Sequence, residues 1–315
     1  MLAVLRASRG QLDAGSISLA LARRWSAEGD QVLLIDADVS GSRLAERLGI
    51  ELRADFSPAV RGMPSLIVAR SRLTLHLLAE HCYSLDTPAG SLWALFAPYS
   101  PVGAQLAADW LSERVVDLMA VDKERSLVTA MAMDDGALRL APVLQASHAV
   151  AVIAPVPSVD AARMLRASCR EAGLLGFERN HRLLIAEGDC PLDADAILLE
   201  TGLHFAGSLS MIDDSRVLRS QGGRKERAFA SQLDEIAARI AALMNIYAAE
   251  ADHLAPLHPP AAHPPAAEKT NGVTAVAGAA AANGAAPSAG LGADGSARPR
   301  HDRLADLQSA FEGIS

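Results

Sequence analysis

The sequence predicts an α/β fold in which a mostly parallel, doubly wound sheet carries helices on both faces and is followed by a disordered tail. Short apolar runs alternate with amphipathic helical patterns over the first part of the chain. Runs that are apolar on both faces are typical of parallel strands between two layers of helices. The composition then changes near residue 250, after which bulky apolar residues become rare.

The expected strands are the apolar runs at 2–5, 32–35, 92–96, 115–121, 149–153, 183–186 and 205–209. Helical patterns fill most of the intervals, and examples lie at 16–28, 104–113, 159–171 and 225–247. Ligands of such sheets bind beyond the carboxyl ends of the strands. We therefore expect function in the loops after Leu5, Ile35, Val121 and Ile153.

The composition divides the chain into three parts. Residues 1–248 are expected to form the sheet domain. Residues 249–300 are rich in Pro, Ala and Gly, which offer too little apolar surface to offset the entropy of ordering, so they predict a flexible linker. Residues 301–315 predict a short amphipathic helix, because Leu304, Leu307, Phe311 and Ile314 recur at three- and four-residue steps.

Charge and cysteine content exclude several classes of protein. The 315 residues carry a formal net charge of −8, which disfavours nucleic acid as a partner because Lys and Arg supply most of the affinity for phosphates. Cys82, Cys169 and Cys190 show neither CxxC spacing nor His neighbours at metal-ligand intervals, so we expect buried or inactive thiols. No signal-peptide or membrane-spanning pattern is present, and we expect a cytoplasmic protein.

The first two strands and the loops after them carry a recognisable pattern. Residues 2–49 read LAVLRASRGQLDAGSISLALARRWSAEGDQVLLIDADVSGSRLAERLG, which combines a strand, a loop, a helix and a second strand that ends in Asp-x-Asp. This order resembles the ParA/MinD family of deviant Walker ATPases, closely over 32–49 and loosely over the rest of the first 245 residues. The stretches 147–165 and 203–223 are similar to late strands and helices of its MinD-like branch. The resemblance implies a P-loop NTPase-like fold.

The resemblance also implies a nucleotide site in the loop before the first helix. The family's K-G-G-x-G-K-T-T aligns with the degenerate loop Arg9, Gly10, Gln11, Leu12, Asp13, Ala14, Gly15 and Ser16. Ala14 then stands at the lysine that bridges the β- and γ-phosphates, and Gly15 at the hydroxyl that holds Mg²⁺. A two-residue shift places Ser16 and Ile17 there, so neither register restores the lysine.

Asp13 opposes phosphate binding further. It replaces a glycine whose N–H would face phosphate, and two like unit charges about 4 Å apart repel by roughly 4 kcal/mol at an effective dielectric near 20. We therefore expect no ATP in the family's usual pose, although ATP and Mg²⁺ are the cofactors that the resemblance implies. Arg9 stands at the lysine that reaches across the dimer in the relatives, so it either pairs with phosphate or is a solvated surface residue.

Three acids complete the implied site. By resemblance, Asp36 lies beside the metal, Asp38 orients the attacking water, and Asp122 closes a strand at a second metal-linked position. Without the lysine, these acids do not stabilise the charge on a transferring phosphoryl group. Asp38 has an alternative role, since DVSGSR has the composition of a turn that leads into a helix.

The stripe of Leu304, Leu307, Phe311 and Ile314 predicts a surface that binds a partner. Membrane-surface helices usually surround such a stripe with Lys and Arg, whereas acids outnumber basic residues in 302–315. We therefore expect the segment to dock into a groove of a protein partner, with membrane contact at most peripheral.

The interpretation that follows is a ParA/MinD-like positioning or scaffold protein, a pseudo-ATPase that localises division, chromosome or plasmid partition, pilus or secretion machinery. It would be recruited to a pole, a septum or a membrane-associated complex. Two alternatives stay open: an active but unorthodox ATPase, and a nucleotide-independent dimeric adaptor.

Overall fold

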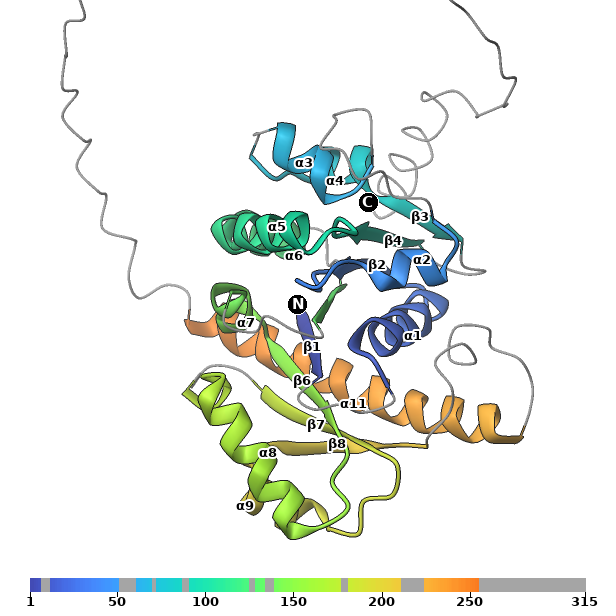
Figure 1. Cartoon of the computed structure of the whole chain (residues 1–315), viewed down its shortest axis with the longest axis vertical. Coiled ribbons are helices and arrows are strands. Elements are labelled where there is room, and N and C mark those ends of the chain that lie inside the picture. Colours follow the sequence, from blue (N-terminus) through green and yellow to red (C-terminus); the bar gives the residue numbers. More distant parts are fainter. Residues whose placement is uncertain are drawn as a thin grey trace, which may run out of the picture. The chain divides into compact units, whose positions relative to one another are not determined.

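The computed structural model describes residues 1–6, 12–50, 61–69, 72–86, 91–124, 128–133, 139–176, 181–210 and 224–254. Within these ranges, eight strands form one sheet in the order β3-β4-β2-β5-β1-β6-β7-β8 (Figure 1). Neighbouring strands pair in parallel, except that β3 pairs antiparallel with β4. The predicted α/β fold with a mostly parallel sheet is confirmed.

The strands and helices have the following bounds. The strands are β1 (Leu2–Arg6), β2 (Gln31–Asp36), β3 (Tyr83–Asp86), β4 (Ser91–Phe96), β5 (Val128–Met133), β6 (Ala149–Ala154), β7 (His181–Glu187) and β8 (His204–Leu209). The helices are α1 (Ala14–Ala27), α2 (Arg43–Arg47), α3 (Met63–Ala69), α4 (Leu75–His81), α5 (Pro101–Glu113), α6 (Val115–Glu124), α7 (Ala141–Ala146), α8 (Val159–Glu171), α9 (Ala194–Thr201) and α11 (Arg224–Leu254).

The direction of each crossover decides which face its helix covers. The connection from β1 to β2 moves toward the β3 edge of the sheet, whereas those from β4 to β5, β5 to β6, β6 to β7 and β7 to β8 move toward the β8 edge. Because crossovers between parallel strands are right-handed, α1 covers one face, and α5, α6, α7, α8 and α9 cover the other. Figure 1 shows α1 on the right of the strands and α5 to α8 on the left.

The long helix α11 packs on the same face as α1. Its buried residues join a single apolar core with α1 and with alternate residues of the strands: Phe229, Leu233, Ile236, Ala237 and Ile240. Trp25 of α1 is buried in this core, and its indole N–H donates to the backbone carbonyl of Ala237 at 3.4 Å. Arg24 and Asp234 form an ion pair at 2.9 Å beside it. The first and last helices of the sheet domain therefore hold each other in place.

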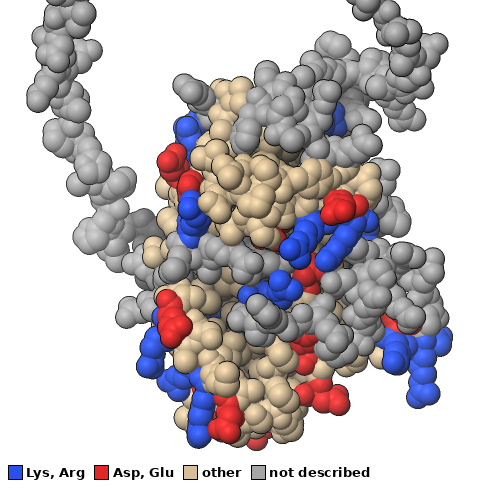
Figure 2. All heavy atoms as spheres, viewed as in Figure 1, with Lys and Arg blue, Asp and Glu red and all other residues tan. Residues whose placement is uncertain are grey.

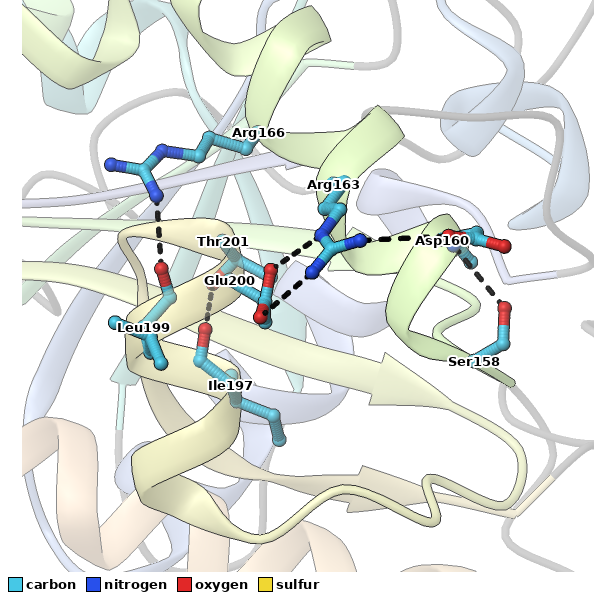
Figure 3. A network of polar contacts seen from close by, with 9 residues as sticks. Ser158, Asp160, Arg163, Arg166, Ile197, Leu199, Glu200 and Thr201 are labelled. Carbon is cyan, nitrogen blue, oxygen red and sulfur yellow. Dashed lines mark hydrogen bonds and ion pairs between the residues drawn. The ribbon is translucent and has the colours of Figure 1, made fainter.

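On the opposite face, polar contacts join α8 to α9 (Figure 3). The Arg163 guanidinium pairs with the Glu200 carboxylate at 2.9 Å, and Arg166 donates to the carbonyl of Leu199 at 2.9 Å. Thr201 in α9 donates its hydroxyl to the carbonyl of Ile197 at 2.6 Å. These two helices accompany the successive crossovers to β7 and β8, so the contacts fix the end of the sheet that lies farthest from α1.

One predicted strand is wrong. Residues 115–121 are part of α6, in which the buried Leu118 and Val121 stand at helical spacing. Leu118 donates its N–H to the carbonyl of Arg114 at 3.0 Å, as in a helical turn. A seven-residue apolar run suits a buried strand and a buried helix equally well, because periodicity does not separate them at that length. The strand of this part of the chain is β5, which lies between β1 and β2.

The other predicted strands and helices that are named above match β1, β2, β4, β6, β7, β8, α1, α5, α8 and α11. The chain forms two units, Met1–Ala251 and Asp252–Ser315. Residues 249–254, which the sequence assigned to the linker, are instead the end of α11. The rest of the predicted linker and the terminal helix lie outside the described residues. Among the helices in the described ranges, none has the length and apolar character needed to cross a membrane.

The buried thiols give a test of the fold. Burial raises the pKa of Cys82 to about 12 and that of Cys169 to about 11, while Cys190 is only partly buried. Because the thiolate is the reactive form, an aromatic disulfide reagent at about pH 8 should modify Cys190 first. Cys82 and Cys169 should react only after urea unfolds the chain. Mass spectrometry that found Cys82 labelled as fast as Cys190 would contradict this packing.

Candidate functional site

The candidate site lies at the carboxyl edge of the sheet, where β1 leads into α1 and β2 leads into α2. Arg9 and Gly10 of the predicted loop lie outside the described residues. Asp13 caps α1, and Ala14, Gly15 and Ser16 form its first turn, where all three are buried. The chain thus places the described half of the predicted loop at a helix N-terminus, where unpaired N–H groups attract anions.

A carboxylate of the chain itself occupies this helix N-terminus. Asp13 has extended backbone angles (φ −93°, ψ 153°), and its Oδ1 accepts from the backbone N–H of Ser16 at 2.8 Å. Its Oδ2 accepts from the Ser16 hydroxyl at 2.8 Å. Asp13 is only 7% exposed. The residue that the sequence marks as an obstacle to phosphate is therefore a helix cap that is built into the structure.

The Asp13 charge is balanced by an arginine from a different element. Arg47, the last residue of α2, pairs with Oδ2 of Asp13 and also donates to the Ser16 hydroxyl at 3.1 Å. A guanidinium has several donors in a fixed plane, so one side chain bridges both acceptors. The negative charge that sequence reasoning set against a nucleotide is thus already paired inside the protein.

A second carboxylate engages the backbone just before α1. Glu187, at the end of β7, accepts from the N–H of Leu12 at 3.0 Å, and both residues are buried. In the alignment with the family loop, Leu12 is a loop residue whose neighbours would surround phosphate. Protein carboxylates therefore accept from the N–H groups of Leu12 and Ser16.

Side chains lie close to Gly15 in the first turn of α1. A Cβ placed on Gly15 would lie 3.0 Å from Oδ1 of Asp13 and 3.5 Å from Cβ of Leu44 in α2. Ala14 has no amine at the position of the family's lysine. In the described part of the site, the cation near the start of α1 is Arg47, and Arg47 is paired with Asp13.

The two acids at the end of β2 stabilise the turn that follows them. Asp36 accepts from the Ser42 hydroxyl at 2.5 Å and from the N–H of Asp38 at 3.3 Å. Asp38 accepts from the N–H of Ser40 at 2.9 Å and from its hydroxyl at 2.8 Å. Ser42 in turn caps α2 through the N–H of Ala45. The turn role that the sequence offered for Asp38 is present, and both acids are buried.

The third acid of the predicted site does not stand where the sequence placed it. Asp122 lies in α6, not at the end of a strand, and its side chain is outside the described residues. The strand between β1 and β2 is β5, and in the sequence Met133 at its end is followed by Asp134, which is also outside those residues. Over the described ranges, no three His, Cys, Asp or Glu residues cluster so as to hold a metal ion.

The residues of the candidate site that the sequence did not reveal are Arg47 and Glu187. Arg47 stands 34 positions after Asp13, and Glu187 stands 175 positions after Leu12. No local pattern connects such residues. The one available signal is electrostatic, since a buried acid at a helix cap needs a cation or donors near it.

Gly41 fixes the turn between β2 and α2 against the loop after β4. It has a φ of +106°, and a Cβ there would lie 2.1 Å from the carbonyl oxygen of Tyr99. Ser42 donates its N–H to the carbonyl of Pro98 at 3.2 Å, and the Tyr99 hydroxyl donates to the carbonyl of Ile50 at 2.8 Å. The turn and α2 are therefore attached to the neighbouring loop at both ends.

Gly41→Ala should destabilise the protein by about 2 kcal/mol or more, because a side chain meets both a positive φ and a backbone oxygen. Gly29→Ala is the matched control: its φ is +102°, and nothing lies within 4 Å of the added Cβ. In the control, only the strain of a side chain at positive φ should lower the free energy of unfolding, by about 1 kcal/mol. Urea unfolding measures both. Equal losses would show that the contact with Tyr99 contributes nothing.

Comparison with known proteins identifies the fold. No family model matches the chain, and a search of proteins of curated function gives no match. Among solved structures, the ParA family ATPase of Chlorobium tepidum is 16% identical with a TM-score of 0.54, and the match covers 76% of this chain and 97% of that one. MinD of Pyrococcus furiosus is 10% identical with a TM-score of 0.53, covering 77% and 98%.

A third similar structure is the McdA–ATP complex of Cyanothece, which is 16% identical with a TM-score of 0.51; the match covers 78% of this chain and 96% of that chain. At these identities the likeness concerns the fold. The chain has the ParA/MinD-like P-loop fold that its sequence resemblance predicted.

Proposed function

We propose that this protein is a positioning or scaffold protein on a ParA/MinD-like fold, a pseudo-ATPase that acts through protein partners. The observation that carries the proposal is the Asp13 carboxylate at the start of α1, paired with Arg47 and bonded to Ser16. In the P-loop fold this helix N-terminus is where phosphate binds. Here the same donors already serve an acid of the chain.

The energetic argument supports loss of ATP binding. A phosphate at this position would have to take the Ser16 N–H from Asp13 and compete for Arg47, and would leave the carboxylate beside it. Asp13 is buried while Arg47 is partly exposed, so taking Arg47 away from Asp13 would leave a buried carboxylate without its cation, which is costly. Lysine in the working loop offsets such repulsion, and Ala14 does not.

The positioning role draws on the similar structures. Those of Aquifex aeolicus are described as a MinD cell division protein and a MinC:MinD cell division protein complex. By analogy, the chain would localise a cellular machine in the cytoplasm, at a pole, at a septum or at a membrane-associated complex, as a homodimer or with another protein. In the view of Figure 2, basic and acidic side chains are mixed over the described surface, which favours protein over nucleic acid as the partner.

Nucleotide binding is the direct test. With Mg²⁺ present, a fluorescent ATP analogue should bind the full chain with a Kd above about 1 mM, and a Kd of 1 mM corresponds to a binding free energy of roughly −4 kcal/mol. Calorimetry with ATP itself should show no saturable heat. Micromolar binding together with turnover that Asp38→Ala abolishes, and that the exposed-acid control Asp160→Ala leaves intact, would establish the active-ATPase alternative instead.

The partner is expected to bind the predicted terminal helix. Leu307→Asp with Phe311→Asp should remove the partner from pull-downs and disperse a fluorescent fusion of the full chain, because it places charge on the apolar stripe. Gln308→Ala with Ser309→Ala is the matched control on other positions of the same segment. If the aspartate variant kept its partners and its cellular position, residues 301–315 would not be the docking segment.

A further inference from the structure

We infer that Arg47 fastens α2 to the start of α1, so that the segment from Asp36 to Ile50 keeps one position whether or not nucleotide is present. The inference rests on the proposed function, in which Asp13 stands in place of a bound phosphate. It adds a consequence for conformation: the ion pair replaces the nucleotide as the link between the loop after β2 and the helix after β1.

The helix α2 depends on contacts with the rest of the protein. It has five residues, Arg43–Arg47, and a helix this short is unstable on its own because too few hydrogen bonds offset the cost of nucleation. Its Leu44 and Ala45 are buried in the core. The position of α2 therefore depends on its buried side chains and on the contacts at its two ends.

The N-terminal end of α2 is held by β2 and by the loop after β4. Ser42 bonds to Asp36 through its hydroxyl and to Pro98 through its N–H, and Gly41 fits against Tyr99. These contacts do not involve α1. They anchor the start of α2 to the sheet.

The C-terminal end of α2 reaches α1 through Arg47. Its guanidinium contacts both the Asp13 carboxylate and the Ser16 hydroxyl. Leu44, one turn earlier, approaches the position of a Cβ on Gly15 at 3.5 Å. Arg47 therefore supplies a charged contact beside the apolar contact of Leu44, and its partner Asp13 is only 7% exposed.

The junction also explains why the segment would not respond to ATP. A loop that moves with nucleotide gains its contacts from the γ-phosphate and loses them on hydrolysis. Here the equivalent negative charge is covalently part of the chain at Asp13, so its effective concentration does not vary with nucleotide. The segment has no ligand-dependent contact at this point to gain or lose.

Hydrogen exchange of the full chain tests the inference. The amides of Leu48, Gly49 and Ile50 donate to carbonyls within the segment at 3.1, 3.0 and 2.9 Å, so their exchange reports whether α2 and its end stay closed. In Arg47→Met, which keeps much of the side-chain length but removes the charge, their exchange should accelerate about tenfold or more through local opening. Amides of β6 and β7 should keep their wild-type rates.

Arg43→Met is the matched control, since Arg43 is an exposed arginine on the same helix and its loss should leave these amides unchanged. Arg47→Lys provides a second variant, in case Arg47→Met does not fold. It keeps the charge without the planar fork, and should give an intermediate acceleration. Unchanged exchange in both Arg47 variants would overturn the inference.

The two proposals fail in different ways. Exchange of the wild-type segment should be the same with and without Mg-ATP. If ATP bound at micromolar concentration while Arg47→Met still opened the segment, the pseudo-ATPase proposal would be wrong, and the inference that Arg47 holds α2 at the start of α1 would stand. If ATP did not bind and Arg47→Met left the amide exchange of the segment unchanged, the inference about Arg47 would be wrong and the pseudo-ATPase proposal would stand.

Discussion

The ion pair between Asp13 and Arg47 is the interaction on which the site depends. A helix N-terminus carries a partial positive charge and unpaired N–H groups. In this chain the Asp13 carboxylate accepts from one of these groups, the N–H of Ser16, and from the Ser16 hydroxyl. The carboxylate requires a cation because it is buried, and α2 provides one. The Asp13 carboxylate thus caps α1 and joins α1 to α2.

The acids after β2 follow the same logic. In the family pattern Asp36 and Asp38 would face a metal and an attacking water, whereas here each accepts hydrogen bonds from a serine of the following turn. Ser42 then caps α2, which delivers Arg47 to Asp13. Glu187 binds the backbone of Leu12 from the other side. Together these contacts stabilise the loops and helix starts at this edge of the sheet.

Sequence periodicity predicted most of the described fold, and its errors have a physical cause. The apolar strands of the centre were found because a strand that is buried on both faces leaves a continuous apolar run, as in Ala149–Ala154. The run at 115–121 is also rich in apolar residues, although it contains Asp117, and it folds as a helix. The strand β5 has the sequence VTAMAM, which includes a threonine and two alanines. Asp122 was expected at the end of a strand because residues 115–121 were predicted to be that strand. When the element is wrong, the position expected for a residue at its end is wrong as well.

By itself, the sequence determined which groups are present at the start of α1: an alanine where the family has its lysine, and an acid, Asp13, where the family has the glycine just before that lysine. Only the tertiary structure decided what that acid does. In the strand order, only β5 separates β2 from β1, so the end of β2 and the helix α2 after it come close to the end of β1. The same order brings β7 close enough for Glu187 to reach Leu12. Hydrophobic periodicity is local and fixes elements, whereas partners such as Arg47 and Glu187 meet their targets only after the sheet has assembled, and no spacing along the chain encodes that meeting.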